Sequence, residues 1–152
     1  MKVIAVVGGR KSGKTTLIEG LVRELSRLGY RVAVLKHIHH DDFEFDVPGK
    51  DTWRAARAGA IAVVGASGSK SFIELRGSIG LRALLRAVEE LAGPELALLE
   101  GFSEEIRGLE GVGVISMGGR ELEGLDVLCE CGGPGDLERA LEAVRSFLGA
   151  TS

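Results

Sequence analysis

Short apolar runs alternate with amphipathic segments along most of the chain. Residues 3–7, VIAVV, form a β-branched apolar run that glycines follow at once, which is typical of a buried parallel strand. From Lys14 to Gly29, leucines recur at the spacing of one helical face: Leu17, Leu21, Leu25 and Leu28. Residues 31–36, RVAVLK, predict a second strand. The opening is therefore expected to be a βαβ unit with a glycine loop after its first strand.

The rest of the chain continues this alternation. Helical patterns cover residues 51–60, 79–93 and 135–149, and strand patterns cover residues 61–67, 95–101, 111–116 and 125–130. We expect residues 61–67 to form a third buried strand and residues 72–76 to form an edge strand or hairpin arm. The pattern predicts an α/β fold with a mostly parallel twisted sheet flanked by helices on both faces, built as a single domain over residues 1–152.

Composition narrows the class of protein. The 152 residues are 45% hydrophobic and 27% charged, as in a globular domain with a full core. A formal net charge of -3 without long runs of one sign gives no reason to expect nucleic acid or a membrane surface as partner. The apolar runs are far shorter than the roughly 20 residues of a membrane helix, and the N-terminus does not resemble a signal peptide. We expect a cytoplasmic protein.

The only cysteines are Cys129 and Cys131. We expect residues 125–130 to form a strand and the two side chains to point to opposite faces of it. That arrangement would disfavour a disulfide or a complete zinc site and would leave two buried thiols.

The segment GGRKSGKTT fits the pattern G-x-x-x-x-G-K-[ST] at Gly8, Gly13, Lys14 and Thr15. In such a loop, consecutive backbone N–H groups turn inward around a phosphate, and the following helix directs its positive end at the same anion. Lys14 is expected to reach the β- and γ-phosphates, and Thr15 to coordinate Mg²⁺. A glycine-rich turn that only links a strand to a helix is the alternative. The position between a strand and a helix favours a P-loop NTPase.

Five further residues belong to this expected site. Gly9 and Ser12 complete the phosphate-binding loop. Arg10 and Lys11 either neutralise phosphate charge or face solvent. Thr16 either supports the α-phosphate or caps the helix.

A P-loop also needs an acidic group at the carboxyl end of a neighbouring strand, to hold Mg²⁺ or its water. The run LALLEGF places Glu100 directly after four apolar residues. Glu100 is therefore the candidate for holding magnesium or orienting water, and with Lys14 the candidate catalytic pair. An ordinary strand-end carboxylate in solvent is the alternative.

A polar stretch from Lys36 to Asp46 follows the second strand, so we expect it at the same edge of the sheet. As a zinc site it is weak, because its histidines do not come from separate elements. A phosphate or substrate loop fits better. Its donors would be Lys36, His37, His39 and His40, and its carboxylates that can meet Mg²⁺ are Asp41, Asp42 and Asp46. Lys50 and Arg54 would follow at the start of the next helix, near any anion. A solvated loop of mixed charge is the alternative.

Three segments in this order, GGRKSGKTTL, LKHIHHDDFEFDVPGKDTWRAARAGA and LLEGF, resemble the MobB family of molybdopterin-guanine dinucleotide biosynthesis accessory proteins. The second segment is the most specific. The resemblance implies a homodimeric GTP-binding P-loop protein with weak GTPase activity. Such a protein assists the guanylyltransferase that attaches GMP to molybdopterin, either free or in its molybdenum form.

The resemblance also implies roles for particular residues. Gly13, Lys14, Thr15 and Thr16 would hold GTP and Mg²⁺, and Glu100 would serve the metal or its water. A distinctive loop would border the nucleotide or the pterin, with molybdopterin as a possible ligand; its matching residues are His39, His40, Asp46, Lys50 and Asp51. Within this site Thr15, Asp46 and Glu100 are the candidate metal ligands.

The chain departs from the family pattern in two places. Ser103 follows EGF where the family has Lys, and the stretch after it is shortened. The usual guanine-reading pattern [NT]-K-x-D is absent, since the chain has no Asn and no Thr followed by Lys-x-Asp. We expect residues 116–121 to read the base instead. A small-molecule P-loop kinase and a non-hydrolysing interaction module remain alternative functions.

Overall fold

The computed structural model of the chain describes residues 1–40, 43–119 and 122–149. The chain divides into two compact units. Unit 1 comprises Met1–His37 and Gly80–Ser152, and unit 2 comprises Ile38–Ile79. The expectation of one domain over residues 1–152 stays a prediction.

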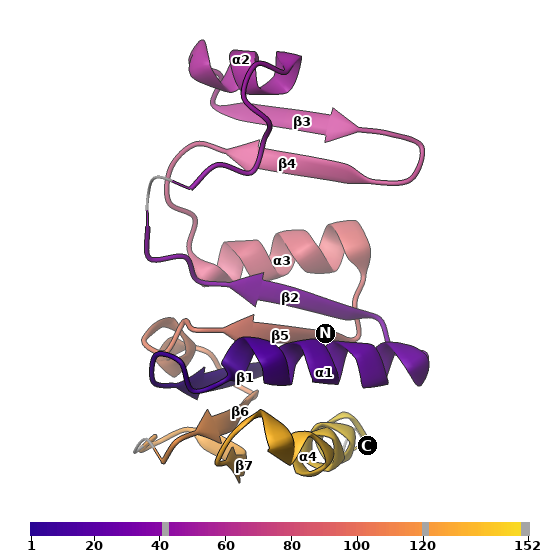
Figure 1. Cartoon of the computed structure of the whole chain (residues 1–152), viewed down its shortest axis with the longest axis vertical. Helices are drawn as coiled ribbons and strands as arrows, with labels where there is room; N and C mark the ends of the chain where they lie inside the picture. Colours follow the sequence, from indigo (N-terminus) through magenta and orange to yellow (C-terminus); the bar gives the residue numbers. More distant parts are fainter. Residues whose placement is uncertain (41–42, 120–121, 150–152) are drawn as a thin grey trace. The chain divides into compact units, whose positions relative to one another are not determined.

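Unit 1 is built on a five-stranded parallel sheet in the order β2-β5-β1-β6-β7. The strands are β1 (Lys2–Gly8), β2 (Val32–Lys36), β5 (Leu96–Glu100), β6 (Val112–Met117) and β7 (Asp126–Cys131). β1 lies at the centre, which explains why its apolar run has no polar interruption. Because the strands run in one direction, their carboxyl ends share one edge of the sheet (Figure 1).

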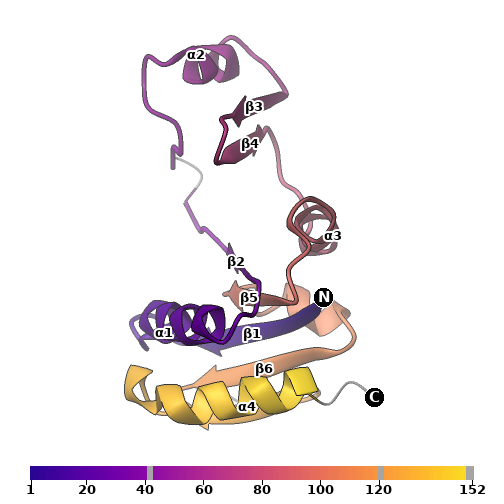
Figure 2. The same cartoon turned by 90° about the vertical axis from the view of Figure 1, so that its right-hand side faces the viewer.

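Helices cover both faces of this sheet. α1 (Lys14–Arg27) and α4 (Leu137–Gly149) are neighbours on one face (Figure 2). There they bury residues such as Leu21 and Val144 against Ile4 and Leu98. α3 (Leu81–Ala92) packs Leu81 and Leu85 onto the other face. Two short 3-10 helices, Glu105–Gly108 and Pro134–Asp136, complete the unit. The predicted α/β class with a mostly parallel sheet and helices on both faces is confirmed.

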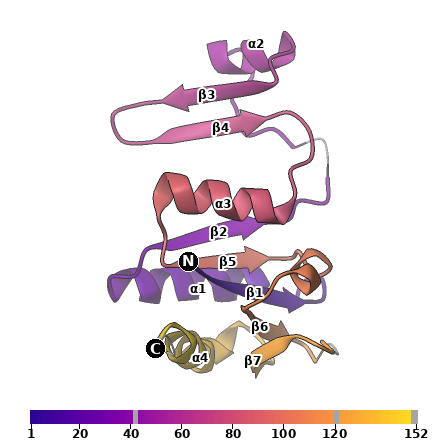
Figure 3. The ribbon, with the colours of Figure 1, turned by 180° about the vertical axis from the view of Figure 1, so that it is seen from behind.

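Unit 2 contains α2 (Asp51–Arg57) and an antiparallel hairpin of β3 (Ala62–Ala66) and β4 (Ser71–Leu75) (Figure 3). The hairpin confirms the expectation for residues 72–76. The expectation of a buried third strand in the main sheet is wrong, because β3 pairs only with β4 and only Val63 of its residues is buried. A short apolar run is compatible with a fully buried strand and with a strand that has one uncovered face.

The expected orientation of the cysteines is also wrong. Cys129 and Cys131 lie on the same face of β7, both buried in the core below α4, and their Sγ atoms are 3.9 Å apart. Residues two apart in a strand share a face, so the spacing itself requires this arrangement. Both thiols are free.

No helix within residues 1–40, 43–119 and 122–149 is long and apolar enough to cross a membrane.

Candidate nucleotide site at the carboxyl edge of the sheet

The loop between β1 and α1 is tightly constrained at its two glycines. A Cβ on Gly8 would lie 2.5 Å from the Met117 carbonyl oxygen, so only glycine lets β6 come this close. Gly13 has φ 88°, and a Cβ there would lie 2.7 Å from Cδ of Pro134. Lys11 also has a positive φ, 61°, which helps the backbone to curl. The loop has the turned backbone that phosphate binding requires.

Lys14 is folded back across this loop. Its Nζ donates to the Gly9 carbonyl at 2.7 Å and the Gly8 carbonyl at 3.2 Å, and lies 3.5 Å from Ser12 Oγ. The ammonium group is therefore held over the loop by its own backbone. A phosphate oxygen would meet a positive charge at this point.

The N-terminus of α1 adds to this potential. No side chain caps the helix, and its first turn contains no acidic residue. The positive dipole end of the helix therefore faces the loop with no acidic side chain in its own first turn to offset it. Exposed Thr15 and Thr16 place two hydroxyl groups in the same turn.

Glu100 ends β5 beside the loop. β5 lies between β2 and β1, so Glu100 pairs in register with Lys36 on one side and Val6 on the other. Its Oε1 accepts a hydrogen bond from Thr15 Oγ1 at 2.8 Å and lies 3.3 Å from Lys36 Nζ. The Glu100 side chain is only 12% exposed. The structure thus brings together two of the expected metal ligands, and a hydroxyl with a carboxylate is a donor set that suits Mg²⁺.

The backbone at the end of β5 is held in place by contacts with His37. The backbone N–H of His37 donates to the Glu100 carbonyl at 2.9 Å. The imidazole ring of His37 packs against the Phe102 ring, with 5.2 Å between the centroids. Gly101 has φ 84°, and a Cβ there would be 3.0 Å from the His37 Cβ. His37 therefore supports the strand end that carries Glu100.

Several other predicted residues belong to unit 2 or lie outside the described residues. His39, His40, Asp46 and Lys50 belong to unit 2, so their part in a nucleotide site stays a prediction. Asp41 and Asp42 lie outside the described residues, as does the end of the expected base-reading segment at Arg120 and Glu121. Of that segment, Ser116 is buried, and its hydroxyl has no hydrogen-bond partner. In the described ranges, no three His, Cys, Asp or Glu side chains converge as a metal site.

Two contacts were missed from the sequence. The sequence predicts Lys36 as a donor in a phosphate or substrate loop, whereas the structure shows it in an ion pair with Glu100. Its position at the end of an apolar strand is a signal, but only the strand order shows which acid it faces. Pro134 packs against Gly13 from more than a hundred residues away, and no local pattern indicates that contact.

Comparisons with known proteins identify the family of the chain. The family model of molybdopterin guanine dinucleotide synthesis protein B, MobB, matches residues 3–109. The molybdopterin-guanine dinucleotide biosynthesis adapter protein of Haemophilus influenzae is 36% identical over 105 residues, 68% of this chain and 58% of the relative. A putative adapter protein of the same description from Methanocaldococcus jannaschii is 31% identical over 128 residues, 84% of this chain and 51% of the relative. The chain thus spans little more than half the length of these relatives.

Solved structures give the same result. A crystal structure of molybdopterin-guanine biosynthesis protein B superposes with a TM-score of 0.60 at 27% identity, covering 97% of this chain and 99% of the other. Bacillus subtilis MobB, with a TM-score of 0.65 at 24% identity over 99% of this chain and 100% of the other, supports the fold alone. The P-loop NTPase fold and the match over residues 3–109 together show that the chain belongs to the MobB family of molybdopterin guanine dinucleotide synthesis proteins.

Proposed function

We propose that this chain is a GTP-binding adapter protein with slow GTPase activity, which assists a guanylyltransferase in forming molybdopterin-guanine dinucleotide in the cytoplasm. The names of its relatives support the pathway and the adapter role. The main observation in favour of nucleotide binding is the contact of Thr15 with Glu100 beside the uncapped start of α1.

The loop residues Gly9 to Thr16 would surround the phosphates. Lys14 would exchange its hydrogen bonds to the Gly8 and Gly9 carbonyls for hydrogen bonds to phosphate oxygens. Mg²⁺ would lie against Thr15 and Glu100, where it would neutralise phosphate charge. Glu100 already accepts a hydrogen bond from Thr15 and lies beside Lys36, so it serves the cation rather than taking a proton from water. Intrinsic hydrolysis without a dedicated base or arginine finger is slow.

The hairpin of unit 2 supports the homodimer. Val64 and Ile73 are directly opposite in register and therefore share one face, on which they are 61% and 49% exposed. Leu75 extends the same face and is 48% exposed. An uncovered apolar face of this kind marks an interaction surface, and a second copy of the chain would offer an equally apolar one.

Calorimetric titration with GTP and ATP in Mg²⁺ tests the proposal. We expect GTP to bind more tightly than ATP, with slow phosphate release and no acceptor required. Lys14→Ala should abolish binding, whereas Lys2→Ala, at the opposite end of β1, should not.

Equal or stronger ATP binding, together with transfer of the γ-phosphoryl group to a small metabolite, would instead establish a kinase. Co-purification of the wild-type chain with a guanylyltransferase, dependent on GTP, checks the adapter role. A P-loop variant that retains this association in full would contradict nucleotide control.

A further inference from the structure

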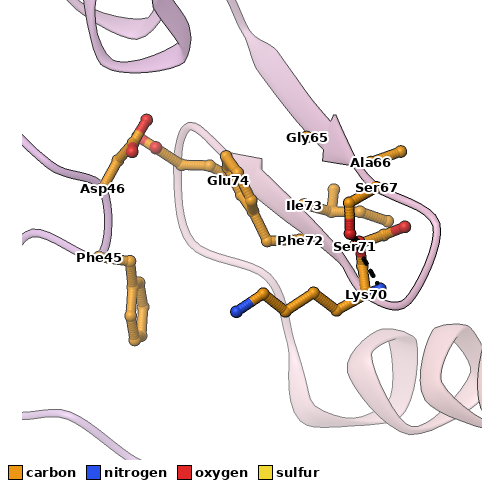
Figure 4. A pocket seen from close by; sticks show the side chains of 10 residues that line it. All are labelled: Phe45, Asp46, Gly65, Ala66, Ser67, Lys70, Ser71, Phe72, Ile73 and Glu74. Carbon is orange, nitrogen blue, oxygen red and sulfur yellow. Dashed lines mark hydrogen bonds between the residues drawn. The ribbon is translucent and has the colours of Figure 1, made fainter. Parts of the chain in front are cut away.

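Unit 2 contains a cleft of its own, with a volume of about 710 Å³ (Figure 4). The β3–β4 hairpin forms its floor, and Phe45 with Asp46 forms its wall. The volume lies in the range of small-molecule sites. All of its lining residues belong to unit 2, so the cleft is complete within that unit.

An aromatic ring lies flat on the floor of the cleft. Gly65 and Phe72 are opposite in register, and a Cβ on Gly65 would lie 2.2 Å from Cε1 of Phe72. The ring therefore occupies the space that a side chain at position 65 would need. The Phe45 ring at the wall is 79% exposed. The two aromatic rings that line the cleft are suited to a flat ring system.

A buried carboxylate oxygen without a hydrogen-bond donor lies at one end of the cleft. Asp46 Oδ1 accepts from the Val47 N–H at 2.7 Å, but Asp46 Oδ2 is buried and has no hydrogen-bond partner. Glu74 shares the floor with Phe72, and its side chain extends toward Asp46 (Figure 4). A buried acceptor without a donor is costly, and a ligand that brings N–H groups to this end removes that cost.

A cation lies at the other end. The turn before β4 is fixed by Ser67, whose Oγ donates to the Lys70 carbonyl at 2.8 Å and accepts from the Lys70 N–H at 3.1 Å. The Lys70 side chain extends into the cleft on the side of Phe45 (Figure 4). A ligand with N–H donors at one end and an anionic group at the other would therefore match the cleft at both ends.

We propose that this cleft binds a fused heterocycle with a 2-amino-4-oxopyrimidine edge, in the form of a pterin. The edge presents a ring N–H and an exocyclic amino group side by side, which two carboxylates can accept together. The two phenylalanine rings contact the faces of the heterocycle, and Lys70 meets an anionic substituent. Guanine carries the same edge; the choice of pterin rests on the proposed function.

The test uses the full chain without nucleotide, titrated with pterin and followed by pterin fluorescence. Asp46→Asn keeps an acceptor for Val47 but removes the charge, and should weaken pterin binding about tenfold or more. Phe45→Ser changes a largely exposed side chain and should also weaken binding. Asp126→Asn, an exposed aspartate on β7, is the matched control and should leave it unchanged. Lumazine, which has an oxo group in place of the 2-amino group, should bind at least tenfold more weakly to the wild-type chain.

Gly65→Ala gives a second test that leaves the carboxylates intact. The new methyl group must displace the Phe72 ring, so pterin binding should weaken although Asp46 and Glu74 are unchanged. Lys70→Ala should affect a pterin that carries a phosphate ester and spare unsubstituted pterin.

Three outcomes would overturn the inference. They are absence of pterin binding, equal affinity in Asp46→Asn and the wild-type chain, and displacement of pterin by guanosine at equal affinity in the Lys14→Ala chain. The last result would assign the cleft to a guanine base. GTP binding is measured separately, so GTP binding without pterin binding rejects this inference alone, and pterin binding without GTP binding rejects only the nucleotide proposal.

Discussion

Gly13→Ala should destabilise the protein through two separable effects, both visible at the start of α1. The residue has φ 88°, in the left-handed region, and its Cβ would lie 2.7 Å from Cδ and 3.2 Å from Cγ of Pro134. The backbone effect depends on the residue alone. The contact effect depends on Pro134.

The two effects have different sizes. A non-glycine residue in the left-handed region costs about 1–2 kcal/mol. Overpacking against a rigid proline ring adds a cost of about 1–3 kcal/mol. The alanine variant has a lower conformational entropy in the unfolded state, and this stabilises the folded protein by about 0.4–1 kcal/mol. We expect a net loss of about 2–4 kcal/mol. In a Pro134→Ala background the loss should be smaller by about 1–3 kcal/mol, because the ring carbons that clash are gone.

Urea denaturation of the four proteins in this double-mutant cycle gives the comparison. Gly9→Ala is the matched control, because it lies in the same loop without a positive φ and a Cβ there meets no atom within 4 Å. It should change the free energy of unfolding by less than about 0.5 kcal/mol. If Gly13→Ala costs the same with and without Pro134, the contact argument is wrong. If it costs no more than Gly9→Ala, the conformational argument is wrong as well.

Three further predictions follow from the site, the thiols and the hairpin. Glu100→Gln keeps an acceptor for Thr15 but loses the negative charge that would bind the cation. GTP affinity should therefore fall about 10–100-fold in Mg²⁺ and stay unchanged in EDTA. An equal fall under both conditions would place Glu100 outside the metal site. Burial raises the pKa of the Cys131 thiol from 9.0 to about 12, so above pH 9 the unfolded chain loses a proton that the folded chain keeps, and stability should fall with rising pH. The loss should reach about 1 kcal/mol at pH 10 by urea denaturation and be absent from a Cys129→Ala, Cys131→Ala double variant. Val64→Lys should convert a homodimer to a folded monomer, as measured by sedimentation velocity. Leu28→Lys, at a site 53% exposed in unit 1, is the control and should leave the dimer intact. A dimer that persists in Val64→Lys would exclude this hairpin face as the dimer interface.

What could be predicted from the sequence was local or followed from the direction of the strands. The P-loop is one contiguous segment, and its glycine spacing carries its geometry. Glu100 was located because the carboxyl ends of parallel strands meet at one edge, whichever strands are neighbours. Its contact with Thr15 bears out that placement.

What could not be predicted depends on pairing between distant segments. β5 lies between β1 and β2, so the partner of Lys36 is set by strand order rather than by sequence distance. The apolar run of β3 does not indicate whether a helix or solvent covers each face, and Val63 and Val64 therefore differ in burial. The cysteine error had another origin, since the period of a strand already places Cys129 and Cys131 together.

The position of Lys14 has a kinetic consequence. Its ammonium group donates hydrogen bonds to the carbonyls of Gly8 and Gly9, which keeps it over the loop. An arriving nucleotide would then exchange one set of hydrogen bonds for another and would not need to fold a disordered segment. When the nucleotide leaves, the same side chain can return to the carbonyls, so the loop keeps its shape between successive ligands.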